Sequence, residues 1–163
     1  MTTKIDYTAE EWELIMRAPF MAAMAVMASS PSGPIGFVKE MFAVGGALQA
    51  VTQEGAPNAL VSALVTDVKA GHRPSAPTES IQDGAEAKAL GLKACQDVSA
   101  LLAHKAPGPE AEGFKRWLLS TAQRVAEAAK EGGFLGIGGV RVSEAETAVL
   151  AELAGALGVP TEG

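Results

Sequence analysis

The apolar residues of this chain recur mainly at the spacing of an α-helix. The first such run follows Thr8, which forms a capping-box pattern with Glu11, and it continues to about Ala28. Pro19 lies inside the run and is expected to kink the helix near Ile15, because a proline removes one backbone hydrogen bond. Beyond this point nearly every face is apolar, so we expect the helix to be buried on all sides, in the domain centre or against another subunit.

The same periodicity predicts five further helices, separated by loops rich in glycine, proline and serine. In chain order they begin near Pro34, after Asn58, after Asp83, near Phe114 and after Ser143. The predicted ends are at Gly55–Pro57, Gly71, Ala106–Pro109, Gly132–Gly133 and Gly158. No long run alternates with the period of a strand, so the pattern indicates an all-α bundle of about six helices with short loops.

The first and last helical hairpins of this prediction resemble each other. The stretch from Trp12 to Leu48 and the stretch from Trp117 to Leu153 both contain an apolar helix, a glycine-containing loop and a glutamate. Such a repeat would relate the two hairpins by a pseudo-two-fold axis. The alternative is that two amphipathic hairpins, each with a tryptophan, are alike by chance.

Composition agrees with one helical domain over residues 1–163. Hydrophobic residues make up 48% of the chain but aromatic residues only 5%, and Ala, Leu and Met favour helices over strands. The net charge of −6 argues against nucleic acid and anionic membranes as partners. The longest apolar stretch, Ala18 to Ala28, is shorter than the roughly 20 residues of a membrane span. A single cysteine excludes an intrachain disulfide and fits the cytoplasm of a bacterial cell.

Two apolar features are candidates for partner binding. The glycine-rich loop Gly132–Gly139 carries large side chains that either tuck into the core around a tight reversal or contact a partner. A phosphate cradle is disfavoured, because the loop has no following Lys-Ser/Thr pair and no preceding strand. Methionines of the first helix either belong to the core or form an adaptable binding surface. The partner-binding candidates are Phe134, Leu135, Ile137, Met21 and Met24.

The sequence offers little for catalysis. Cys95 lies on or near an apolar helix face and is expected to be a buried thiol. His72 falls in a polar connection and His104 near a helix end, and neither has the Glu-x-x-His spacing of a di-iron bundle. We therefore predict no catalytic residue and no cofactor.

The last third of the chain resembles the C-terminal helical hairpin of the tellurite-resistance TerB-like family. The resemblance lies in Val125–Gly133, Val142–Glu146 and Leu153–Val159, where one helix ends at a glycine and Ser-x-x-Glu opens the next. It implies an all-helical fold and a divalent metal bound by acidic residues. Ser143 and Glu146 match the family pattern, and Glu131 is the acid nearest the family's Ala-Asp-Gly turn. The metal-ligand candidates are therefore Glu131, Glu144 and Glu146, of which the last two also suit a helix N-terminus electrostatically.

Two functions follow from these patterns. The first is a helical interaction module, homo-oligomeric, that binds a partner protein without catalysis, as the apolar first helix and the apolar glycine-rich loop indicate. The alternative is a TerB-like, divalent-metal-binding stress-response protein.

Overall fold

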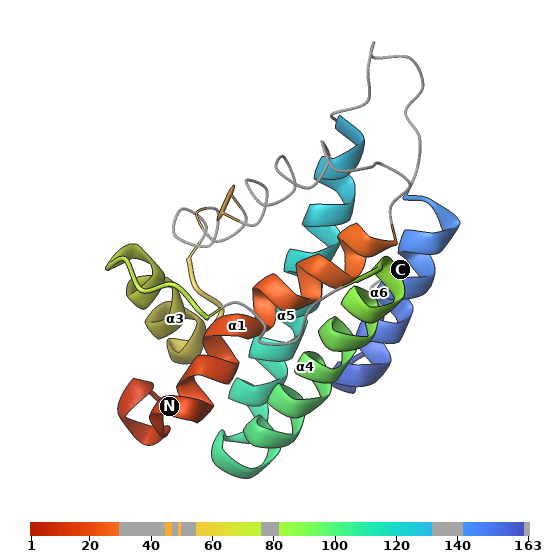
Figure 1. Ribbon diagram of the computed structural model, residues 1–163. Coiled ribbons are helices and arrows are strands. Elements are labelled where there is room, and N and C mark those ends of the chain that lie inside the picture. Colours follow the sequence, from red (N-terminus) through yellow and green to blue (C-terminus); the bar gives the residue numbers. More distant parts are fainter. Residues whose placement is uncertain (30–44, 47–48, 50–54, 76–81, 132–141, 162–163) are drawn as a thin grey trace.

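The computed structural model describes residues 1–29, 45–46, 49, 55–75, 82–131 and 142–161, and every element within them is helical (Figure 1). The elements are a 3-10 turn, η1 (Lys4–Asp6), and the α-helices α1 (Ala9–Ala28), α3 (Ala59–Lys69), α4 (Gly84–Lys105), α5 (Gly108–Glu131) and α6 (Glu144–Leu157). The predicted all-α class is thus confirmed. The described residues contain five α-helices where six were predicted, and the helix predicted near Pro34 lies largely outside them. None of the five combines the length and hydrophobicity that a bilayer crossing requires.

Four helices begin where the sequence predicts, because a polar side chain caps each of them. A free backbone N–H of the first turn donates to the side-chain oxygen of the residue before the helix. These cap bonds are Glu11 N to Thr8 at 3.2 Å, Val61 N to Asn58 at 3.0 Å, Glu86 N to Asp83 at 2.9 Å and Glu146 N to Ser143 at 3.2 Å. In α1 and α6 the glutamate also accepts from the cap residue's backbone, which completes the predicted capping boxes.

The start of α5 corrects the sequence-based interpretation. The helix begins at Gly108 and not near Phe114, although Ala106–Pro109 does end α4 as predicted. The backbone N–H groups of Glu110 and Ala111 both donate to Pro107 O at 2.9 Å, so the new helix starts immediately. Pro109 falls in the first turn, where a missing N–H breaks no intrahelical bond, and a proline there does not stop the helix.

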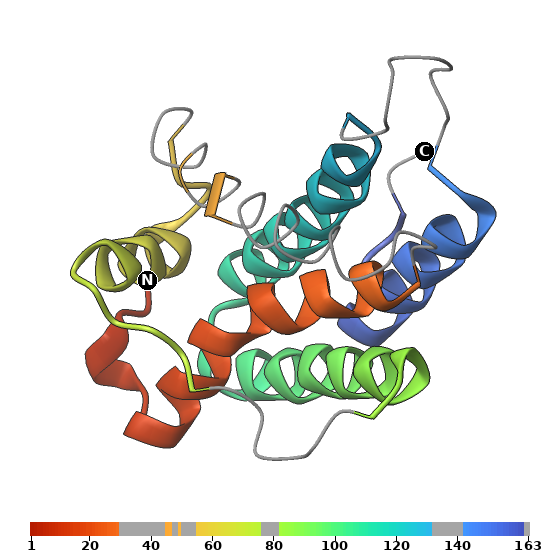
Figure 2. The ribbon, with the colours of Figure 1, turned by 45° about the horizontal axis from the view of Figure 1, so that its top comes forward.

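The first helix is the centre of the bundle. It contacts α4, α5 and α6, and Figures 1 and 2 show it lying alongside α4. Its second half is buried on nearly every face, as its apolar pattern predicts, and it carries Pro19 within the helix. The buried side chains there are Ala18, Pro19, Met21, Ala22, Ala23, Ala25, Val26 and Met27. The burial within one chain accounts for this helix without a second subunit.

Close contact between α1 and α4 depends on Gly91. A Cβ at this position would lie 2.5 Å from Met21 O and 2.6 Å from Ala25 Cβ, well inside van der Waals distance. The absence of a side chain therefore allows the backbones of the two helices to approach each other.

Helix α3 lies at one end of the bundle, beside η1 and α5 (Figure 2). Its inner face buries Leu60, Val61, Leu64 and Val65. The helix ends at Lys69, and Gly71 follows the cap residue with a φ of +94°, the left-handed conformation that glycine adopts without strain. Ser75 N then donates to Glu13 Oε1, so the chain that leaves α3 passes along α1.

Candidate functional site

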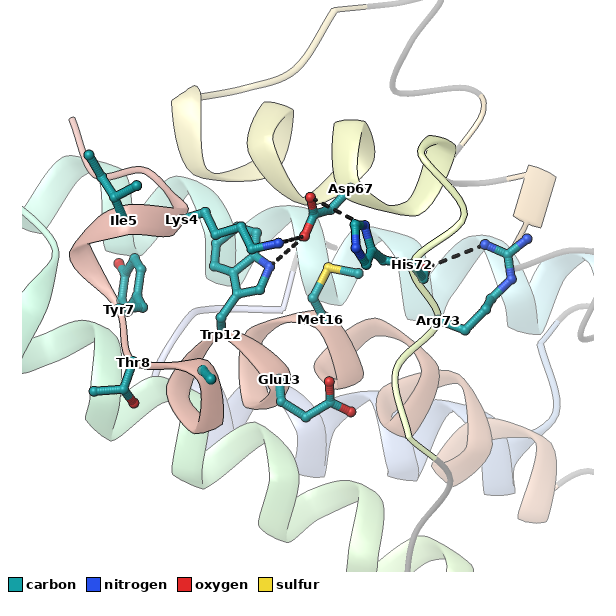
Figure 3. A pocket seen from close by; sticks show the side chains of 11 residues that line it. Lys4, Ile5, Tyr7, Thr8, Trp12, Glu13, Met16, Asp67, His72 and Arg73 are labelled. Atoms are coloured by element: carbon teal, nitrogen blue, oxygen red, sulfur yellow. Dashed lines mark hydrogen bonds and ion pairs between the residues drawn. The ribbon is translucent and has the colours of Figure 1, made fainter.

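A pocket of about 490 Å³ opens between η1, the first half of α1 and the C-terminal end of α3. Figure 3 shows side chains from all three elements converging on it. Its volume lies within the range of roughly 300–1,000 Å³ that is typical of ligand sites. Because its walls come from segments far apart in the chain, the site exists only in the folded protein.

The Asp67 carboxylate is the polar centre of the pocket. Its Oδ2 accepts from Lys4 Nζ at 2.7 Å and from Trp12 Nε1 at 2.8 Å, while His72 Nδ1 lies 3.6 Å from Oδ1. The hydrogen bond from Lys4 is the main cause that lowers the pKa of Asp67. Desolvation raises this pKa, and the hydrogen bond from Trp12 lowers it further. Asp67 is therefore ionised at neutral pH and links α3 to both α1 and η1.

The wall on the α1 side is apolar and almost fully buried. Trp12 is 5% exposed and Met16 3% exposed, and both rise from α1 toward Asp67 (Figure 3). Tyr7 packs against Trp12 with ring centroids 6.0 Å apart. Ile5, at the outer rim on η1, is 91% exposed. The apolar wall thus extends from a buried floor to a fully solvated side chain.

A second set of hydrogen bonds holds the N-terminal segment in place. The backbone N–H of Thr2 donates to Glu110 Oε2 at 2.8 Å and its hydroxyl to the same oxygen at 2.9 Å. Asn58 Nδ2 donates to the Glu110 carbonyl at 2.9 Å, which ties the start of α3 to α5. Tyr7 shares a hydrogen bond with the Thr2 hydroxyl at 3.0 Å, and burial raises the pKa of Tyr7. Thr2, before η1, is therefore bonded both to Glu110 of α5 and to Tyr7, after η1.

Two residues that follow α3 line the mouth of the pocket. His72 and Arg73 follow Gly71 directly, and both are exposed. Arg73 Nη1 donates to Val68 O at 3.1 Å and to His72 O at 3.4 Å. A guanidinium bound to the last carbonyls of a helix is favoured by the helix dipole. These bonds also fix the position of the charge at the pocket edge.

The partner-binding residues predicted from the sequence lie elsewhere. Met21 is 5% exposed and lies at the contact of α1 with α4, and Met24 is partly buried against the same core. Neither lines the pocket. Phe134, Leu135 and Ile137 lie outside the described residues.

Two of the three acids predicted as metal ligands, Glu144 and Glu146, have described side chains. Glu144 is exposed, whereas Glu146 is 3% exposed and its Oε2 accepts from Ser143 N and Ser143 Oγ, each at 2.9 Å. The side chain of Glu131 is outside the described residues. Across the ranges that the structure describes, no group of three or more His, Cys, Asp or Glu residues is positioned to hold a metal ion.

The chemistry of the pocket suits binding better than proton transfer. Asp67 has a lowered pKa and two strong donors, so it is a weak base. The one cysteine, Cys95, is fully buried, and burial raises the pKa of its thiol to about 12. A thiol with that pKa is not a nucleophile at neutral pH.

Sequence reasoning missed Lys4, Ile5, Asp67 and Arg73 as site residues, because no local pattern joins them. Asp67 did carry a signal. It lies in the last turn of α3, where the helix dipole disfavours a carboxylate, so its presence there indicates a tertiary partner.

The described residues thus form a helical bundle, and a pocket with apolar and charged side chains lies between η1, α1 and α3. Comparison of the chain with known proteins adds no family. No protein-family model matches it, and no curated protein or solved structure does so either. The TerB-like resemblance therefore stays a prediction.

Proposed function

We propose that this protein is a non-catalytic helical module that docks a segment of a partner protein in the pocket between η1, α1 and α3. The partner covers the exposed side chain of Ile5 at the rim of this pocket. The module works in the cytoplasm, where its single cysteine stays a thiol.

The observation that carries the proposal is the exposed apolar side chain of Ile5 at the rim of the pocket, where it is 91% exposed. A partner that covers Ile5 removes its side chain from water, which favours binding. Trp12 and Lys4 are already held by hydrogen bonds to Asp67, which reduces the entropy lost on binding.

A second copy of the chain is a poorer occupant than a different protein. Each copy carries a net charge of −6, so two copies repel each other at low ionic strength. The self-association predicted from the sequence is therefore an alternative outcome of the same experiment.

In-cell photo-crosslinking tests the docking site. A photoreactive amino acid replaces Ile5, and in a matched control it replaces Glu112, an exposed residue of α5. We expect an adduct of one defined mass from position 5 and none from position 112. Ala9→Trp, which fills the pocket from its exposed edge, should abolish the adduct, whereas Ala148→Trp on the exposed face of α6 should leave it unchanged.

Two results would contradict the proposal. An adduct that persists in Ala9→Trp would show that the pocket is not the docking site. An adduct of twice the chain mass that Ala9→Trp removes would make a second copy of this chain the occupant, in place of a different protein.

A further inference from the structure

The carboxylate of Glu110 is buried and accepts hydrogen bonds from Thr2. Glu110 is 8% exposed, and the backbone nitrogen of Thr2 lies 3.1 Å from its Oε1 and 2.8 Å from its Oε2. The Thr2 hydroxyl donates to the same Oε2 at 2.9 Å. The first turn of α5 favours an ionised carboxylate at this position, because the N-terminal end of the helix dipole is positive. An ionised carboxylate that is buried is stabilised most by a cation close to both of its oxygens.

The Thr2 nitrogen has the position of such a cation but, as part of a peptide bond, it lacks the charge. An amide nitrogen carries one proton, so it cannot donate fully to both oxygens of Glu110 at once. An ammonium nitrogen at the same place has three protons and a positive charge, so it can bond to both oxygens. Thr2 would carry such a nitrogen if it were the first residue of the chain.

Met1 contributes little to this arrangement. It is 96% exposed, whereas Thr2 is 8% exposed, so the boundary between solvated and packed chain falls at the peptide bond that joins them. The loss of Met1 therefore removes no buried contact and leaves the Thr2 nitrogen where it is.

We propose that the peptide bond between Met1 and Thr2 is a processing site, and that the ammonium group released at Thr2 forms an ion pair with Glu110. A peptidase hydrolyses the bond. The carbonyl carbon of Met1 takes the oxygen of water and becomes a carboxylate, while both protons of water go to the Thr2 nitrogen. Cleavage precedes the docking of Thr2, which is buried afterwards. The same ion pair forms whether or not further residues precede Met1, because only the chain from Thr2 onward takes part.

This ion pair goes beyond the proposed docking site and does not depend on it. Neither Thr2 nor Glu110 lines the pocket, although Thr2 leads directly into η1. A failure of the photo-crosslinking experiment therefore leaves the processing site untouched, and a chain that keeps Met1 leaves the docking site untouched.

The first test is the mass of the protein purified from the cells that make it. We expect the intact and fragment masses to place Thr2 first, with an unmodified amino group. A protein that keeps Met1, or one whose Thr2 nitrogen is acetylated, would overturn the proposal, because neither has a free ammonium group at Thr2.

The ion pair itself is tested on two chains that begin at Met1 or at Thr2, each made by removal of a cleavable leader protein. In urea, the chain that begins at Thr2 should have an equilibrium constant for unfolding about tenfold lower, the usual effect of adding a charge to a hydrogen bond. Glu110→Gln should abolish this difference between the two chains. Glu112→Gln, which changes an exposed acid of the same helix, should leave the difference in place.

An amine-directed reagent provides a second readout that needs no substitution. The α-amino group of Thr2 should react at least about tenfold more slowly in the folded protein than in urea, because it is buried and paired. The exposed α-amino group of the chain that begins at Met1 is the control and should react alike in both conditions. Peptide mass spectrometry separates these amines from the lysines.

Three results would overturn the ion pair. The first is an equal unfolding constant for the two chains. The second is a difference that Glu110→Gln leaves unchanged, since Met1 itself would then destabilise the fold. The third is a Thr2 amino group that reacts as fast in the folded protein as in urea.

Discussion

At the scale of single residues, the environment of Asp67 opposes and supports its charge at the same time. It lies near the C-terminal end of α3, where the helix dipole opposes its charge, yet its pKa is lowered. The hydrogen bonds from Lys4 and Trp12 outweigh both the dipole and the cost of partial burial. Asp67 thus contributes to stability through groups that are distant in sequence.

Asp67→Asn tests this contribution. An asparagine oxygen can still accept from Trp12, but it loses the charge that attracts Lys4, so the free energy of unfolding at neutral pH should fall by about 1 kcal/mol. Asp97→Asn is the matched control, because the Asp97 pair with Lys93 is exposed and a surface pair contributes little. Urea unfolding of the three proteins measures both changes, and equal losses would contradict the assigned role.

The same substitution predicts a pH dependence. A carboxylate whose pKa is lowered in the folded state stabilises the protein at pH values above its ordinary pKa of 3.8. This stability is lost as the pH falls through the folded-state pKa. The difference in unfolding free energy between wild type and Asp67→Asn should therefore be constant from about pH 7 to about pH 5 and shrink below about pH 4. A difference that grows on acidification would show that Asp67 is not held ionised by its partners.

At the scale of helices, most boundaries could be predicted because they are set locally. Thr8, Asn58, Asp83 and Ser143 each cap the turn that follows, and a cap can be read from a few adjacent residues. The start of α5 differs from the prediction, because Pro109 does not break the helix but lies in its first turn, with which a proline is compatible. The pocket could not be predicted, because positions 4, 12 and 67 meet only through the packing of three elements.

The contact of α1 with α4 gives a prediction at this scale. Gly91→Ala raises helix propensity, but its Cβ would meet Met21 O and Ala25 Cβ, so the helices must separate. We expect a loss of about 1–3 kcal/mol in unfolding free energy, as is typical of an overpacked core. Gly155→Ala on α6, where no atom lies within 4 Å, should instead stabilise by up to about 1 kcal/mol.

Denaturant unfolding of both glycine variants tests whether the unfolding free energy falls in Gly91→Ala and rises in Gly155→Ala. Two stabilised variants would mean that α1 and α4 are not in close backbone contact at Gly91. Two destabilised variants would mean that the effect at Gly91 does not come from that contact.

At the scale of the whole molecule, Cys95 reports on the integrity of the bundle. Its side chain is fully buried on α4, and burial raises the pKa of its thiol to about 12. A thiol reagent can therefore reach it only when the bundle opens. For a domain of ordinary stability we expect labelling to be slower than in denaturant by at least about a thousandfold.

Labelling followed by mass spectrometry measures this ratio, with the protein in guanidinium chloride as the reference. A native rate within about tenfold of the denatured rate would show that α4 opens without global unfolding. The chain has one cysteine, so the mass change is assigned without further mutation.

The bond between Thr2 and Glu110 has a kinetic consequence. These residues are separated by 108 positions in the chain, so the N-terminal segment can reach its native contacts only after α5 is in place. Closing so long a loop costs entropy, and contacts of this kind form late in folding. Residues 2–7 are thus among the last of the described residues to become ordered, and the pocket that they help to form is completed only when α5 is already in place.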